Sequence, residues 1–197
     1  MDTSEHSLSI AVFCGASDGH SPRYAATADD LGTRIAAGGH RLVYGAGGVG
    51  TMGAVARAAA TGGAPILGVI PEFLRTREMG DDLPPQDIVL TADLLERKRV
   101  MIDSADAFIA LPGGYGTLDE ILEVVSMAAL GQHVGPLVLV DVDCDWDPLL
   151  RVVDGLLQRG FIRDAGLIRI AADPREALDM VVRGRADAMA GASNARV

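Results

Sequence analysis

Residues 107–120 of the chain read AFIALPGGYGTLDE. An apolar run of strand length comes first, glycines crowd positions 113–116, and an apolar pattern at helical spacing begins at Leu118. Glycines let the backbone take positive φ angles and approach a ligand closely, and the free N–H groups of a helix start attract anions. This stretch therefore predicts a strand, a turn that binds an anion such as phosphate, and a helix.

The same residues also fit a common helix start, the capping box. In that arrangement Thr117 would accept a hydrogen bond from the N–H group three residues on, and Glu120 would reach back to the N–H group of Thr117. A capping box does not need a cluster of glycines ahead of it. We therefore favour the phosphate turn, which leaves Glu120 one helical turn beyond the anion.

Acidic residues crowd the first turns of this predicted helix. Glu120 and Glu123 are three residues apart on one face, and Asp119 lies beside them. Like charges this close raise the pKa of one of them, whereas the helix dipole favours ionisation. We expect at least one of these carboxylates to be ionised near neutral pH.

Outside this stretch, strand-like runs alternate with helical patterns along the chain. The alternation predicts an α/β fold: a single-domain, Rossmann-like, doubly wound parallel sheet with helices on both faces and ligands at the carboxyl ends of the strands. The domain is expected to span 1–184, with a flexible tail over 185–197. The predicted strands cover 8–14, 41–45, 66–70, 87–90, 107–111, 136–142 and 168–171. The polar segment 71–86 is expected to be either a lid or a plain surface loop.

A second glycine-rich stretch follows the second predicted strand. Gly48, Gly50 and Gly53 match the G-x-G-x-x-G fingerprint of dinucleotide-binding folds. The acidic residue expected about 20 positions later falls on Glu72, beyond a proline. We therefore favour a single mononucleotide site over a NAD site. In that site this stretch would form a second glycine-rich wall, and Gly47 and Gly48 would contact the ligand.

Neighbouring residues distinguish three consecutive basic residues. Arg99 has Glu96 three residues before it and Asp103 four residues after it, which is typical of a solvated, salt-bridged helix face. Lys98 lies instead on an apolar stripe, and Arg97 lies at the edge of that stripe. Either these two cations face an anion-binding cavity, or their side chains extend along the surface to reach water.

Composition narrows the classes of function. The net charge of −10 opposes binding to a nucleic acid backbone. No apolar stretch approaches the roughly 20 residues that span a membrane, and the polar start lacks the features of a signal peptide, so we expect a cytoplasmic protein without a membrane partner. Cys14 and Cys144 show no disulfide or metal-ligand pattern and are expected to be buried and reduced. Lys98 is the only lysine, which makes a pyridoxal phosphate enzyme a poor fit.

The motif P-G-G-x-G-T-x-x-E at residues 112–120, with Glu-Arg-Lys upstream at 96–98, resembles the LONELY GUY (LOG) family of cytokinin riboside 5'-monophosphate phosphoribohydrolases. That family was long mislabelled as lysine decarboxylases. The resemblance covers about residues 8–180. The second glycine stretch of the family usually reads Y-G-G-G-x-x-G-L-M-G, and this chain departs from it at Ala46 and Thr51.

The resemblance implies hydrolysis of a nucleoside 5'-monophosphate to free base and ribose 5-phosphate, with no metal or organic cofactor. Glu120 would be the catalytic carboxylate, and Arg97 would be its cationic partner near the departing base or the phosphate. The residues expected to bind substrate are Lys98, Gly113, Gly114, Tyr115, Gly116, Thr117, Gly47, Gly48 and Glu123.

The identity of the base and the assembly state are further expectations. Family members usually carry Met-His where this chain has Leu94-Leu95, and a tryptophan near Met127. These differences affect the base pocket. An N6-prenylated adenine is still the base that we expect first, and the unsubstituted adenine of AMP is the second. The alternatives are an AMP nucleosidase, or a nucleotide or molybdenum cofactor carrier without turnover. The wide apolar surface of the helix at 118–130 and the family resemblance both indicate a homodimer.

Overall fold

The computed structural model describes residues 7–80, 83–132 and 134–194. Within this part of the chain, one parallel seven-stranded sheet has the order β4-β3-β2-β1-β5-β6-β7. This confirms the predicted doubly wound sheet. The strands are β1 Ser9–Phe13, β2 Arg41–Tyr44, β3 Ile66–Pro71, β4 Asp87–Thr91, β5 Ala107–Ala110, β6 Leu137–Val140 and β7 Arg169–Ala171.

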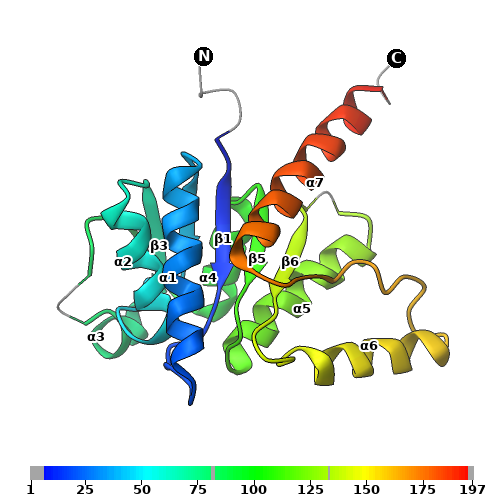
Figure 1. Ribbon diagram of the computed structural model, residues 1–197, viewed down its shortest axis with the longest axis horizontal. Coiled ribbons are helices and arrows are strands. Elements are labelled where there is room, and N and C mark those ends of the chain that lie inside the picture. The colour runs from blue at the N-terminus through cyan, green and yellow to red at the C-terminus, as the bar shows by residue number, and fades with distance from the viewer. Residues whose placement is uncertain (1–6, 81–82, 133, 195–197) are drawn as a thin grey trace.

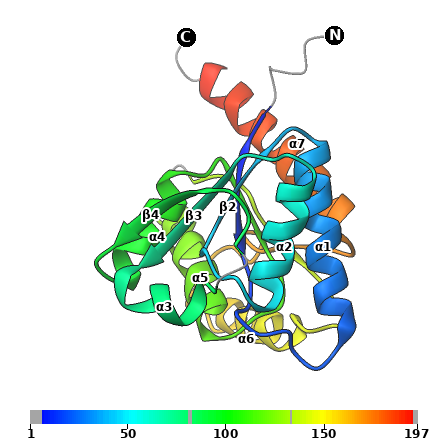
Figure 2. The ribbon, with the colours of Figure 1, turned by 90° about the vertical axis from the view of Figure 1, so that its left-hand side faces the viewer.

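Helices cover both faces of the sheet (Figures 1 and 2). Side chains of α1, α2 and α7 pack on one face, and side chains of α4, α5 and α6 pack on the other. The helices are α1 Pro22–Ala37, α2 Gly50–Thr61, α3 Arg75–Glu78, α4 Leu94–Asp103, α5 Tyr115–Ala129, α6 Asp147–Gln158 and α7 Pro174–Asn194, with a short 3-10 helix, η2, at Glu72–Leu74.

The central strands are apolar on both sides because both sides are covered, whereas Ile88 and Leu90 of the edge strand β4 are exposed. In β1, Ile10 and Val12 point into the core shared with α1, α2 and α7, whereas Ala11 and Phe13 point into the core shared with α4 and α5. Successive side chains of a strand alternate between faces, so a strand covered on both faces reads as a continuous apolar run. This explains why the strands were predicted without an alternating polar pattern.

The topology places a cleft between β1 and β5. From β1 the chain runs through β2 and β3 to β4 at one edge, and from β5 it runs through β6 to β7 at the other edge. The loops that follow β1 and β5 therefore leave in opposite directions. Open parallel sheets bind ligands at the carboxyl ends of the strands at such a switch point.

Three sequence-based expectations need correction. The helix α7 continues to Asn194, because the alanine-rich residues after Gly184 favour helix, whereas we predicted a tail from residue 185. The segment 71–86 holds η2 and α3 where only loop was expected. Cys14 is buried as predicted, but Cys144 is exposed.

In the described residues, no helix is long and apolar enough to cross a membrane.

The packing of α1 on α2 depends on Gly32. A Cβ atom added there would lie 2.3 Å from the carbonyl oxygen of Val55. We expect Gly32→Ala to lower the free energy of unfolding by about 1–3 kcal/mol, because this overlap outweighs the better helix propensity of alanine. Urea denaturation measures the change.

The matched control is Gly155→Ala in α6, where the added Cβ would meet only the flexible end of Arg159, at 3.1 Å. This variant should be as stable as the wild type or more stable by up to about 1 kcal/mol. Equal effects of the two substitutions would contradict the described packing of α1 on α2.

Candidate active site

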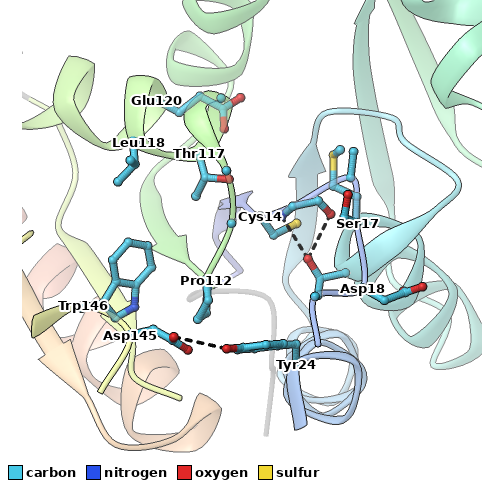
Figure 3. A pocket seen from close by; sticks show the side chains of 18 of the residues that line it. Cys14, Ser17, Asp18, Tyr24, Pro112, Thr117, Leu118, Glu120, Asp145 and Trp146 are labelled. Carbon is cyan, nitrogen blue, oxygen red and sulfur yellow. Dashed lines mark hydrogen bonds between the residues drawn. The ribbon is translucent and has the colours of Figure 1, made fainter. Parts of the chain in front are cut away.

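A cavity of about 880 Å³ opens at the carboxyl ends of the strands, where β1 and β5 lie side by side. The loop after β1, the start of α2, the turn before α5 and the start of α6 contribute to its walls. Figure 3 shows Glu120 at one end and the hydrogen bond between Tyr24 and Asp145 at the other, with Thr117 between them. The predicted position of the site at the switch point therefore coincides with a cavity large enough for a small ligand.

Hydrogen bonds between a backbone group and a side chain hold two of the segments that line the cavity together. The N–H group of Gly15 donates to Oγ1 of Thr51 at 3.0 Å, and the Thr51 hydroxyl donates to the carbonyl of Gly15 at 3.0 Å. Gly50 has a φ of +63°, and a Cβ atom there would lie 2.4 Å from the backbone nitrogen of Ser17. Only glycine allows the loop after β2 to approach the loop after β1 this closely.

This packing changes the interpretation of the second glycine stretch. Thr51 and Met52 line the cavity, but Gly47 and Gly48 do not. The N–H group of Gly48 instead donates to the carbonyl of Glu78 at 2.7 Å. Gly47 and Gly48 thus do not line this cavity, because Gly48 packs against the backbone of Glu78 and Gly47 lies beside the side chain of Met52, and their contact with a ligand stays a prediction.

The turn of the P-G-G-x-G-T motif forms the start of α5. The helix begins at Tyr115 with Gly114 as its N-cap, and among the described residues no side chain caps it. A Cβ atom at Gly113 would lie 2.2 Å from Oγ1 of Thr117, whereas additions at Gly114 and Gly116 would meet open space. The first N–H groups of the helix therefore face the cavity, where they are free to bind an anion.

The alternative capping box does not form. Because α5 begins at Tyr115 and not after Thr117, Thr117 lies inside the first turn and Glu120 lies in the second. Gly113, Gly114, Gly116 and Thr117 line the cavity, as expected. Tyr115 is 93% exposed and lies outside it.

Glu120 is a buried carboxyl group in the cavity wall, with 9% of its surface exposed. Burial raises its pKa to about 7; the nearby charge of Arg97 acts in the opposite direction, and Asp119 raises the pKa further. A carboxyl group of this kind exchanges a proton at neutral pH. Such groups in a cleft are typical of acid–base sites.

Arg97 is the buried cation of the cavity. Its Nη2 atom donates to the carbonyl of Gly45 at 3.0 Å, and its Nε atom has no hydrogen-bond partner in the described structure. A Cβ atom at Gly45 would lie 1.8 Å from Nη2. A glycine directly after β2 is therefore what lets the guanidinium group reach the cavity.

Lys98 lies outside the cavity, and so does Glu123. The Nζ atom of Lys98 is 2.8 Å from Oδ1 of Asp119 and 3.1 Å from Oε2 of Glu123. Successive residues of a helix point about 100° apart, so Arg97 and Lys98 face different surroundings. Lys98 and Glu123 therefore lie together outside the cavity that Glu120 lines, and their contact with the ligand stays a prediction.

Several cavity residues were not predicted from the sequence. Ser17 and Cys14 follow β1, and the rule that ligands bind at the carboxyl ends of strands would have found them. Burial raises the pKa of Cys14 to about 12, so it stays a neutral thiol. No pattern in the sequence indicates that Glu78 of α3 and Trp146 before α6 line the cavity, because only the folded chain brings them there.

The cavity can hold an anion at the start of α5 and offers a proton-exchanging carboxyl group one turn further on. In the described residues, no group of three or more His, Cys, Asp or Glu side chains is arranged to hold a metal ion. Arg97 adds a positive charge near Glu120. This combination suits cleavage of a phosphorylated substrate whose reacting atom develops positive charge.

Comparisons of sequence place the chain among named relatives. A family model described as a possible lysine decarboxylase matches residues 52–181. The chain is 42% identical over 172 residues to the probable cytokinin riboside 5'-monophosphate phosphoribohydrolase LOGL2 of Oryza sativa subsp. japonica, covering 86% of this chain and 70% of that protein. It is 46% identical over 154 residues to the cytokinin riboside 5'-monophosphate phosphoribohydrolase LOG7 of Arabidopsis thaliana, covering 78% of this chain and 70% of that protein.

Among solved structures, the molybdenum cofactor carrier protein of Chlamydomonas reinhardtii is similar, with a TM-score of 0.67 and 22% identity over 91% of this chain and 99% of that chain. At this level of identity the similarity supports the fold alone.

The raised pKa of Glu120 predicts a stability that depends on pH. The folded protein retains a proton that the unfolded chain releases above its ordinary pKa of 4.5, so stability falls as the pH rises from about 4.5 to about 7. Glu120→Gln removes this titration and should make the protein more stable than the wild type at pH 8, by roughly 1–3 kcal/mol. Urea denaturation at pH 5 and pH 8 measures the free energy of unfolding of both proteins. If it depends on pH in the same way in both, Glu120 does not have the raised pKa of a buried carboxyl group.

Proposed function

Because this chain belongs to the LOG family, we propose that it hydrolyses the N-glycosidic bond of a cytokinin riboside 5'-monophosphate. The products are the free base and ribose 5-phosphate. The observation that carries this function is the carboxyl group of Glu120, buried in the cavity one helical turn beyond the open start of α5.

The start of α5 is the proposed phosphate site. Its first N–H groups carry the positive end of the helix dipole, and Gly114 and Gly116 leave space for the phosphate oxygens. Thr117, which is 2% exposed, contributes a hydroxyl group to the same wall of the cavity. A 5'-phosphate held there directs the sugar toward Glu120.

Glu120 acts on the sugar in its carboxylate form. Breaking the glycosidic bond moves its electron pair onto the base nitrogen and leaves positive charge on the ribosyl carbon, which the carboxylate stabilises. A water molecule then forms a bond to that carbon and transfers a proton to Glu120, and the base nitrogen takes up a proton. A pKa near 7 suits a group that must gain and release a proton in each turnover.

Arg97 supports this step as a fixed positive charge. Its guanidinium group lowers the pKa of Glu120, which burial alone would raise further. The hydrogen bond to the carbonyl of Gly45 fixes its position. We assign Arg97 to the departing base or the phosphate, because both carry negative charge or electron pairs during the reaction.

The base is proposed to be an N6-substituted adenine. The cavity of about 880 Å³ holds a mononucleotide and a substituent on the base. Both named relatives carry the cytokinin riboside 5'-monophosphate in their names. AMP is the second candidate and differs only in the substituent.

Lysine decarboxylation, which the family description suggests, does not fit this chain. Lys98 is the only lysine of the sequence, and its ammonium group pairs with Asp119 and Glu123 outside the cavity. A Schiff-base lysine has to reach the cofactor inside the site. The described geometry gives Lys98 no such access.

We also propose a homodimer. On α5, Leu122 is 46% exposed and Leu130 is 79% exposed, so the chain itself does not cover the wide apolar surface predicted for this helix. Leu95 of α4 is 72% exposed and lines a groove with Met127 of α5. Apolar surface of this extent is typical of contacts between subunits.

The function is tested with purified protein and a panel of nucleotides: isopentenyladenosine 5'-monophosphate, AMP and the corresponding nucleoside without phosphate. We expect release of the base from the first, slower release from AMP, and none from the nucleoside. Glu120→Gln should reduce the rate by about 10²–10⁴-fold without loss of nucleotide binding, because it removes the ionisable group. Chromatography of the products and calorimetry of binding measure these outcomes.

Glu72→Gln is the matched control, since Glu72 is exposed and only weakly paired with Arg75, at 3.7 Å. It should release base at the wild-type rate. Undiminished activity of Glu120→Gln would remove Glu120 from the mechanism. Nucleotide binding by the wild type without any turnover would identify a carrier protein instead.

The homodimer is tested by sedimentation equilibrium at micromolar concentration. We expect twice the mass of the chain, and we expect Leu122→Glu to shift the protein toward the monomer, because it buries a charge in an apolar contact. A wild-type protein with the mass of one chain would refute the proposal.

A further inference from the structure

An ion-pair cluster with a buried cation and two exposed carboxylates joins α4 to α5 beside the active site. The side chain of Lys98 is 9% exposed, and its Nζ atom contacts Asp119 at 2.8 Å and Glu123 at 3.1 Å. Burial lowers the pKa of Lys98, but the hydrogen bonds to these two carboxylates raise it above its ordinary value. The ammonium group therefore stays charged and holds two acidic side chains of α5.

Both ends of this cluster lie next to the proposed catalytic residues in the chain. Lys98 directly follows Arg97 on α4, and Asp119 directly precedes Glu120 on α5. The cluster therefore ties the backbone that carries Arg97 to the backbone that carries Glu120. A change at Lys98 acts on the site although Lys98 does not line the cavity.

The electrostatic role of Lys98 follows from the groups around Glu120. Asp119 and Glu78 raise the pKa of Glu120, whereas Arg97 and Lys98 lower it. Removing Lys98 takes away one of the two cations and leaves the charge of Asp119 without its partner. The titratable groups that act electrostatically on Glu120 are Cys14 after β1, Glu78 of α3, Arg97 and Lys98 of α4, and Asp119 of α5.

We propose that Lys98 is a positioning residue for the reaction, which holds α4 against α5 through Asp119 and Glu123 and thereby favours the carboxylate form of Glu120. The catalytic consequence rests on the proposed function. The effect on the charge of Glu120 does not, so it can be measured independently of activity.

A bridge that only stabilises the fold makes different predictions. Loss of such a bridge would lower activity by the same factor at every pH, or not at all, and would leave the titration of Glu120 unchanged. If Lys98 acts electrostatically, changes at Lys98 and at Asp119 should shift the pKa of Glu120 in opposite directions. Removing the cation should raise the pKa of Glu120, and removing the charge of Asp119 should lower it.

The experiment compares Lys98→Met, Lys98→Arg and Asp119→Asn with the wild type. The titration of the Glu120 carboxyl group is followed by carbon-13 NMR, and base release from isopentenyladenosine 5'-monophosphate is measured between pH 5 and pH 9. The matched control is Arg99→Met, because Arg99 is exposed on the same helix and its pair with Glu96 has a distance of 3.8 Å.

We expect Lys98→Met to raise the pKa of Glu120 by about one unit and Asp119→Asn to lower it. The rate of Lys98→Met should fall about tenfold at pH 6 and approach the wild-type rate at pH 9, since one pKa unit changes the ionised fraction tenfold well below the pKa. Lys98→Arg should restore the wild-type profile, and Arg99→Met should not change it.

An unchanged pKa of Glu120 in Lys98→Met, or shifts of the same sign in Lys98→Met and Asp119→Asn, would overturn the role of Lys98. If Lys98→Met does not fold, Lys98→Gln, which keeps a polar side chain beside Asp119 and Glu123 without the charge, is measured in its place. A wild-type protein that releases no base from any nucleotide would refute the proposed function, whereas the NMR titration would still decide the role of Lys98.

Discussion

The active site depends on keeping an acidic side chain inside the protein in a form that can still ionise. Glu120 is almost fully buried, and burial by itself favours the neutral acid. Arg97 offsets this effect from within the cavity, and Lys98 does so from outside it. Both cations come from α4, but only Arg97 lines the cavity, whereas Lys98 pairs with Asp119 and Glu123 of α5.

Glycines make this arrangement possible at places where any side chain would intrude. Gly45 leaves room for the guanidinium group of Arg97, and Gly50 lets the loops after β1 and β2 touch. Gly113 leaves room for the hydroxyl group of Thr117 at the start of α5. Gly45 and Gly50 follow β2 and Gly113 follows β5, so all three lie at the carboxyl ends of the two strands that flank β1.

Proteins that share this fold do not all carry out the same chemistry. A molybdenum cofactor carrier protein shares the sheet and its covering helices at 22% identity. Function resides in specific side chains on such a scaffold, and the function proposed for this chain depends on a cation and a carboxyl group that both line the cavity at the switch point. The same reasoning separates this chain from a decarboxylase, because its only lysine is engaged in ion pairs.

The sequence by itself determined the order of strands and helices and the glycine turn at the start of α5, because hydrophobic period and glycine clusters are local signals. The expectation that Arg97 acts together with Glu120 came from the family resemblance. The sequence did not determine which of two adjacent cations faces the cavity. Lys98 and Arg97 both border the same apolar stripe, and the choice depends on Asp119 and Glu123, which only the folded chain brings to Lys98. Tertiary structure likewise decided that Gly48 packs against backbone, since the carbonyl group that accepts its N–H group belongs to Glu78 of the distant helix α3.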